Sequence, residues 1–322
     1  MWRLVLLSSI LSLLSAAEAE AKMRLAWQSS DINLQAAYAL GTDAFKAAGL
    51  EAEMKPFASG PAMLPALAAK EVDVAILGDF PAVTGFANGL PINIILLNNV
   101  TTSHTRIVAT PASGIRKLAD LKGRKIGVSL GTTGHGNILK ALSLVGLTQQ
   151  DVTLVNVAPA NIPAAYFANQ IDAAVAWEPH VGAMEKAGAV RIATSQEIGV
   201  INASTLVART DYIRDNPGEI AKLMKIWGDA SAAFRSDRPK FLEYTAKRQN
   251  MSMDELIPLI DRMGMILPSF QEQLSPELLG GKFFGQVQET ARLLLELRRI
   301  EAMPPNLDRL IDAGPMRRVG GN

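Results

Sequence analysis

Short apolar runs alternate with stretches of helical periodicity from residue 22 to about residue 201. In the first half of this region, the β-branched runs predict strands at 24–27, 51–57, 72–77 and 92–97, and the segments between them predict helices at 34–49, 61–70 and 80–88. Repeated strand–helix units favour a mainly parallel sheet with helices on both faces. The first block is therefore predicted to be an α/β lobe.

A second block of the same kind follows the turn-forming segment 110–114. Strands are predicted at 125–129, 152–157, 173–176 and 190–193, with helices at 137–145, 163–169 and 181–187. Because the two blocks are similar in size and pattern, we expect two doubly wound lobes.

The pattern changes after residue 216 to long, charged, amphipathic helices without a strand signal. These helices are expected at 217–235, 239–250, 253–265 and 285–299, and prolines then break the chain before a short segment at 307–313. One more strand at 204–208 would return the chain to the first lobe, so the C-terminal helices are expected to pack there.

The predicted organisation is a signal peptide at 1–21, the first part of lobe 1 at 22–109, lobe 2 at 110–203, and a return to lobe 1 with C-terminal helices at 204–322. The chain would cross between the lobes near residues 106–111 and again near residues 201–206. Two such crossings form a two-segment hinge.

The N-terminus has the features of a secretory signal. Arg3 precedes an apolar run at 4–14, and small residues around Ala19 offer a cleavage site. The alternative is an uncleaved membrane anchor, but the run is shorter than the ~20 residues that span a bilayer. We therefore expect export to the periplasm with cleavage.

Composition excludes several classes of protein. The sequence contains no cysteine, which rules out disulfides, a thiolate metal site and a cysteine nucleophile. A net charge of +1 without a Lys/Arg-rich cluster argues against a nucleic-acid or polybasic membrane partner. We expect a free monomer.

The segments that follow the predicted strands are rich in glycine, hydroxyl groups and amides. Ligands of doubly wound sheets bind at these carboxyl ends of strands, where the N-termini of helices also lie. Ser59, Asp79 and Thr132 or Thr133 are predicted N-caps, and converging helix starts attract an anion. The candidate ligand-binding residues are Gln28, Ser29, Ser59, Gly60, Asp79, Phe80, Thr132, Thr133, Gly134, His135, Trp177 and Glu178.

These segments lack the motifs of nucleotide-binding, metal and catalytic sites. The glycine-rich run 131–136 lacks the lysine of a phosphate-binding loop and the dinucleotide fingerprint. His135 has no partner at the spacing of a metal site, and no nucleophile elbow occurs. We expect no cofactor, no metal and no enzymatic activity.

Five segments, taken in order, carry a family resemblance: 59–61 (SGP), 78–81 (GDFP), 120–128 (DLKGRKIGV), 131–136 (GTTGHG) and 171–179 (IDAAVAWEP). They resemble the aliphatic sulfonate, taurine and nitrate family of ABC-transporter periplasmic substrate-binding proteins. The resemblance implies a type II periplasmic binding protein fold, in which two lobes close on a small oxyanion and then dock onto a permease with its ATPase. It also implies that the strand-end segments of both lobes hold the ligand.

Two carboxylates among the candidate residues narrow the class of ligand that we expect. Asp79 and Glu178 would repel a bare anion, so they favour a ligand with a cationic end, such as taurine; alternatively, both only cap helices. Phe80 and Trp177 would supply apolar walls, which favour an organic ligand over nitrate. The sequence therefore predicts a protein that captures an organosulfonate, either an alkanesulfonate or taurine. The alternatives are binding of nitrate or a thiamin-precursor pyrimidine, a precursor-synthesising enzyme on the same fold, and a periplasmic sensor.

Overall fold

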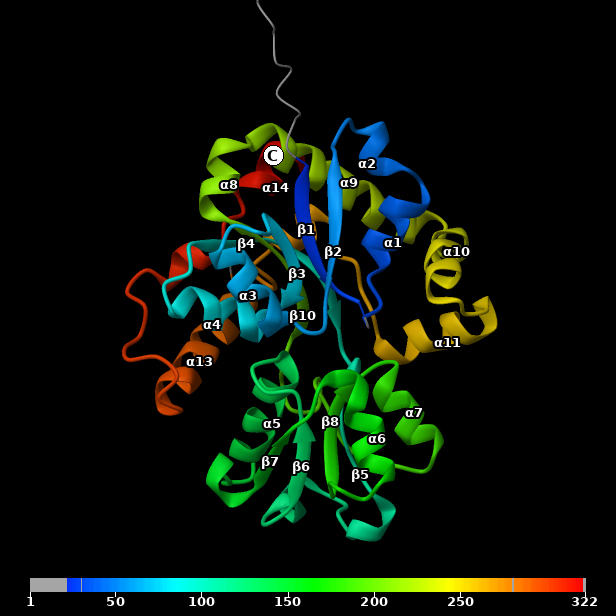
Figure 1. Cartoon of the computed structure of the whole chain (residues 1–322), viewed down its shortest axis with the longest axis vertical. Coiled ribbons are helices and arrows are strands. Elements are labelled where there is room, and N and C mark those ends of the chain that lie inside the picture. Colours follow the sequence, from blue (N-terminus) through cyan, green and yellow to red (C-terminus); the bar gives the residue numbers. More distant parts are fainter. Residues whose placement is uncertain (1–21, 30, 280, 321–322) are drawn as a thin grey trace, which may run out of the picture.

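Two five-stranded sheets form the framework of two lobes that lie one above the other (Figure 1). The computed structural model describes residues 22–29, 31–279 and 281–320, so the predicted signal peptide at 1–21 lies outside the described residues. The first sheet has the order β2-β1-β3-β10-β4 and the second has the order β7-β6-β8-β5-β9. The strands are β1 (Met23–Gln28), β2 (Ala52–Phe57), β3 (Val74–Gly78), β4 (Ile92–Thr101), β5 (Thr105–Ala109), β6 (Lys125–Val128), β7 (Thr153–Asn156), β8 (Ala173–Trp177), β9 (Val190–Thr194) and β10 (Asn202–Arg209).

Each sheet contains one strand that runs against its two neighbours. β10 is antiparallel to β3 and β4, and β5 is antiparallel to β8 and β9, whereas β1 and β6 pair in parallel with both of their neighbours. β5 and β10 enter directly from the other lobe, so they start at the gap between the lobes, where the other central strands end. The predicted mainly parallel arrangement therefore applies to the remaining core strands.

The two crossings between the lobes lie side by side. Residues 102–104 join β4 to β5, and residues 195–201 join β9 to β10. Ser195 Oγ donates to the Thr102 carbonyl (2.9 Å), and Asn202 Nδ2 donates to Thr105 Oγ1 (2.6 Å). The strand pairing places residues 105–109 in the second sheet, although the predicted first lobe extended to residue 109, because β5 precedes the Thr110–Pro111 turn that suggested the boundary.

Helices cover both faces of each sheet. Those of the first lobe are α1 (Leu34–Gly41), α2 (Ala44–Ala47), α3 (Gly60–Ala68) and α4 (Asp79–Ala87), and those of the second are α5 (Thr133–Ser143), α6 (Ile162–Phe167) and α7 (His180–Lys186). The single helix expected at 34–49 is two helices, because Asp43 adopts a left-handed conformation with φ of 53° between them.

The C-terminal helices enclose the first lobe, as Figure 1 shows. They are α8 (Thr210–Asp215), α9 (Pro217–Ser236), α10 (Arg238–Gln249), α11 (Met253–Met263), α12 (Phe270–Leu274), α13 (Lys282–Glu296) and α14 (Gly314–Gly320). Trp227 of α9, Phe283 of α13 and Met316 of α14 are buried in the same apolar cluster as Met23 and Ile76 of the sheet. Residues 307–310 form a 3-10 turn within the segment expected at 307–313.

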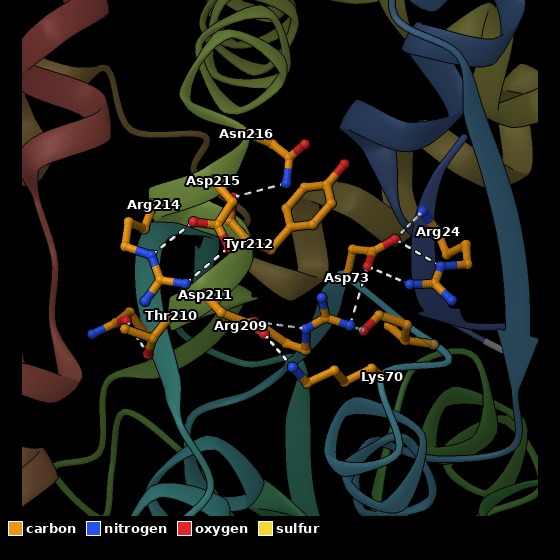
Figure 2. Close-up of polar contacts among 12 residues, drawn as sticks. Arg24, Lys70, Asp73, Arg209, Thr210, Asp211, Tyr212, Arg214, Asp215 and Asn216 are labelled. Carbon is orange, nitrogen blue, oxygen red and sulfur yellow. Dashed lines mark hydrogen bonds and ion pairs between the residues drawn. The ribbon is translucent and has the colours of Figure 1, made fainter. Parts of the chain in front are cut away.

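An ionic cluster holds the first sheet together at the end opposite the gap (Figure 2). The Asp73 carboxylate accepts from the Arg24 backbone N–H (2.8 Å), Nε (2.8 Å) and Nη2 (2.6 Å), and it lies 3.2 Å from Arg209 Nη1. Arg209 Nε and Lys70 both contact Asp211, and the hydrogen bond from Lys70 is the main cause that lowers the Asp211 pKa to about 2. The side chain of Asp73 is 3% exposed, so it links β1, β3 and β10 away from water.

Replacing Asp73 by asparagine is expected to lower the free energy of unfolding by about 3 kcal/mol, because it leaves Arg24 and Arg209 without their shared charge partner. Urea unfolding measures the change. Asp215→Asn is the control, since Asp215 pairs with Arg214 where both side chains are exposed, and it should change stability little. Equal changes in the two variants would contradict the structural role of Asp73.

The lobes also touch where α5 meets α4 and α13. The Phe80 and His135 rings pack edge to face with centroids 5.7 Å apart, and Lys140 Nζ lies 3.2 Å from a Glu289 carboxylate oxygen. A Cβ on Gly136 would lie 2.6 Å from the Phe80 ring, so this close approach requires glycine. His135 Nδ1 accepts from the Gly131 N–H (3.3 Å), and burial lowers the His135 pKa from 6.5 to about 4.

The buried His135 predicts an acid-sensitive stability. Between pH 6.5 and about 4 the unfolded chain binds a proton that the folded chain does not, so stability falls as pH falls through this window. From pH 7 to pH 4.5 the wild type should lose about 2 kcal/mol more stability than His135→Gln, which keeps an acceptor for Gly131. Urea unfolding at both pH values measures this difference, and parallel losses would show that His135 is not buried as a neutral ring.

Candidate functional site

A cleft of about 70 Å³ lies between the lobes, at the strand ends that face each other. β1 and β3 of the first sheet end there, and β8 of the second sheet ends there at Trp177. Six of the predicted residues line it: Gln28, Gly60, Thr132, Thr133, Gly134 and Trp177. Residues distant in the sequence therefore share one cavity because their strands end at the same gap.

Two helices begin at the cleft with unpaired backbone donors. The N–H groups of Gly60, at the start of α3, and of Thr133 and Gly134, at the start of α5, have no hydrogen-bond partner among the described residues. Ser59 and Thr132 are the N-caps, and neither side chain caps its own helix. Because a helix N-terminus carries a partial positive charge, these groups suit an anion.

Trp177 adds a donor from the second lobe. Its side chain is 7% exposed and lines the cleft, and its indole Nε1–H has no partner among the described residues. A buried N–H without a partner is costly unless a ligand or water accepts from it. Trp177 therefore offers both an apolar wall and a hydrogen-bond donor.

The hinge strands contribute polar groups that sequence reasoning missed. Asn99 of β4, Thr105 of β5, and Asn202 and Ser204 of β10 line the cleft. The sequence analysis considered only segments that follow strands, whereas β5 and β10 begin at the cleft; Asn99 was missed although it follows the strand predicted at 92–97. The alternation of Asn202 and Ser204 at the start of a strand next to a crossing is the signal that would have found them.

Asp31 and His104 are the only ionisable side chains that line the cleft among the described residues. His104 Nε2 lies 3.5 Å from Asp31 Oδ1. No lysine or arginine among the described residues lines this cavity, so an anion there would meet dipoles rather than opposite charges.

Asp79 does not line the cleft, although it was expected to face it. Its carboxylate accepts from Thr133 Oγ1 (2.8 Å) and from Gln286 Nε2 (2.6 Å), and Gln286 in turn bonds both the N–H and the carbonyl of Ile201 in the hinge. The N-cap of α4 is Gly78, and Asp79 is the first helical residue. Burial raises the Asp79 pKa, and the bonds from Thr133 and Gln286 oppose the shift.

The neighbouring glycine explains the sequence Gly78–Asp79 at this strand end. A Cβ on Gly78 would collide with Thr133 Oγ1. Only glycine therefore lets the second lobe approach closely enough for Thr133 to reach Asp79. Asp79 joins the two lobes, the hinge and α13.

Glu178 also lies outside the cleft. It is 1% exposed, its Oε1 accepts from Arg106 Nη2, and its Oε2 accepts from the Gly182 N–H (3.2 Å). Arg106 lies on β5, which the sequence analysis did not predict, so this buried ion pair could not be foreseen. Both of its carboxylate oxygens are hydrogen-bonded within the second lobe, and Arg262 Nε of α11 lies 3.9 Å from Oε1.

The other predicted residues also lie away from the cleft. Phe80 and His135 line cavities beside α13 instead, because the first turn of α5 turns His135 toward Phe80. Ser29 Oγ donates to the Phe57 carbonyl (3.4 Å) and is exposed, and the Ser59 side chain does not reach the cavity. Among the described residues, no three His, Asp or Glu side chains are grouped as metal ligands.

Known proteins are similar to this chain in sequence and in fold. The chain is 28% identical over 296 residues to the taurine-binding periplasmic protein of Escherichia coli, covering 87% of this chain and 91% of that protein. The alkanesulfonate-binding protein SsuA from Xanthomonas axonopodis pv. citri, solved bound to MOPS, superposes with a TM-score of 0.74 at 21% identity, covering 91% and 98% of the two chains. The desulfurization enzyme DSZB superposes with a TM-score of 0.67 at 17% identity, covering 92% and 99%.

These likenesses confirm the predicted fold class, with two α/β lobes joined by a two-segment hinge and a helical C-terminal region. They also confirm the resemblance to periplasmic taurine- and sulfonate-binding proteins. The profile of the family described as NMT1/THI5 like matches residues 36–237, more than half of the chain, and the chain therefore belongs to the NMT1/THI5-like family.

Proposed function

We propose that the chain captures a small organosulfonate in the periplasm and delivers it to an ABC importer. The observation that carries this proposal is the cleft itself: residues with unpaired N–H groups, at two helix starts and at Trp177, line one small cavity that no lysine or arginine among the described residues lines. The 28% identical taurine-binding protein supports the assignment of the anion as a sulfonate.

Neutral donors suit a ligand that must be released again. Hydrogen bonds to a charged group each contribute about 1.5–3 kcal/mol. A few such bonds, less the cost of immobilising the ligand, give micromolar affinity, which corresponds to about −8 kcal/mol. A direct ion pair is therefore not required for capture at low concentration.

An organic tail fits the cleft better than bare nitrate does. Ile76, Leu77, Met265 and the Trp177 ring line the same cavity as the donor groups. Apolar walls beside a few oriented polar groups are typical of sites for small organic ligands.

Enzymatic activity is not part of this proposal, although DSZB shares the fold. The sequence has no cysteine, the Thr132 hydroxyl donates to the Ser129 carbonyl, and the Thr133 hydroxyl donates to Asp79, which does not line the cleft.

Delivery would follow from closure of the lobes about the two crossings. The bond between Thr133 and Asp79 joins the lobes, and the closed form would present both lobe surfaces to a permease with its ATPase. No helix among the described residues is long and apolar enough to cross a membrane. Export would depend on the N-terminal segment 1–21, and we propose that the mature protein acts as a monomer.

A ligand panel read by thermal unfolding tests the function. An organosulfonate at about 100 times its Kd should stabilise the folded chain by about 2.7 kcal/mol and raise Tm by about 5 °C. Nitrate, bicarbonate and pyrimidines serve as comparison ligands. Stabilisation by nitrate or a pyrimidine alone would contradict the sulfonate assignment.

Trp177→Phe isolates the indole donor. Loss of one hydrogen bond to a sulfonate is expected to weaken binding about 10-fold or more, as measured by calorimetry, while the ring still fills the wall. Trp227→Phe is the matched control, because the Trp227 indole N–H donates to Asn98 in the core and not to the cleft. Equal affinities for wild type and Trp177→Phe would show that the indole does not bind the anion.

A further inference from the structure

The cleft contains a carboxylate that anion capture does not explain. Among the described residues, Asp31 is the only acidic side chain that lines the cavity, and no lysine or arginine accompanies it. A ligand that is only an anion would place a second negative charge beside it in a cavity of about 70 Å³. This juxtaposition requires either neutralisation by the protein or a positive charge on the ligand.

No lysine or arginine among the described residues lines the cavity, so the protein places no permanent positive charge beside Asp31 there. His104 Nε2 lies 3.5 Å from Asp31 Oδ1, but the buried Nδ1 of His104 has no hydrogen-bond partner among the described residues. The other histidine nearby, His180, has its pKa lowered, mainly by burial.

We propose that Asp31 binds an ammonium group, so that the site selects zwitterionic aminosulfonates such as taurine over simple alkanesulfonates. This inference rests on the proposed function, because it assigns the second end of the ligand in the same cleft. The sulfonate end meets the helix starts at Gly60 and Thr133, and the ammonium end meets Asp31.

The geometry of Asp31 suits this role. Its Oδ1 accepts from the Ile32 N–H (2.8 Å), and its backbone carbonyl accepts from Gln249 Nε2 of α10 (3.3 Å), so the residue is held from both sides. Oδ2 has no hydrogen-bond partner among the described residues, and the side chain remains 23% exposed. A carboxylate that is held in place and has one oxygen without a hydrogen-bond partner can accept a charge-assisted hydrogen bond from a ligand.

A second acceptor lies in the same cavity. Asn202 Nδ2 donates to Thr105 Oγ1, and this bond orients the side-chain amide. The side-chain oxygen Oδ1 of Asn202, which lines the cavity with the rest of the residue, accepts no hydrogen bond from the described residues. An ammonium group has three donors, so Asp31 and Asn202 together would satisfy more of them than either alone. The two carboxylates predicted from the sequence cannot take this role, since Asp79 and Glu178 are bonded within the protein.

Calorimetry with two near-isosteric ligands tests the inference. Propane-1-sulfonate replaces the ammonium group of taurine by a methyl group and keeps the sulfonate. Wild type should bind taurine at least 10-fold more tightly. Asp31→Asn, which keeps an acceptor for Ile32, should weaken taurine at least 10-fold and leave propane-1-sulfonate unchanged or tighter.

Asp79→Asn is the matched control, because Asp79 joins the lobes without lining the cleft. It should weaken both ligands by the same factor. If Asp31→Asn also weakens both ligands equally, or if wild type shows no preference for taurine, the inference is overturned while the proposed function stands. If wild type binds neither ligand, the proposed function fails and the inference fails with it.

Discussion

The carboxylate of Asp79 connects the two lobes with α13 and, through Gln286, with the hinge. It accepts from Thr133 of the second lobe and from Gln286 of α13, and Gln286 also bonds both backbone groups of Ile201 in the hinge. Burial alone raises the pKa of this carboxyl, and the two donors oppose the shift. The cleft is bounded by groups on either side of this contact, so its shape depends on the lobes meeting there.

The same contact explains why the C-terminal helices belong to the functional unit. α13 packs on the first lobe through Phe283, reaches the hinge through Gln286 and reaches the second lobe through the pair Glu289–Lys140. A single helix thus contacts both lobes and one crossing. Motion of the lobes must rearrange the polar contacts along this helix.

The strand–helix order, the two lobes and the placement of most donors at strand ends could be predicted from local pattern. Gly60 and Thr132–Gly134 line the cleft because parallel strands end on one edge of a sheet, and that rule needs no tertiary information. The roles of the acids could not be predicted this way. Asp79 is bonded to a residue 207 positions away and Glu178 to one 72 positions away, and each partner removes its acid from the cleft.

The missed residues have a different cause. β5 and β10 begin at the cleft, so their first residues line it, and a search confined to strand ends passes over Asn202 and Ser204. Asp31 lies three residues after the end of β1, but nothing local distinguishes its carboxylate from a turn-forming one. Its position in the site becomes visible only in the structure, where Asp31 lines the same cavity as the starts of α3 and α5.

Spin-label distances between the lobes test the central claim most directly, and the absence of cysteine makes labelling at chosen sites simple. Exposed Ala69 and Gln170 provide one site in each lobe. The account predicts that a saturating organosulfonate shifts the distance distribution of the wild type to one narrow population, and that Thr133→Val keeps a broad distribution under the same conditions. A bound ligand with the same broad distribution in both proteins would contradict closure through Asp79.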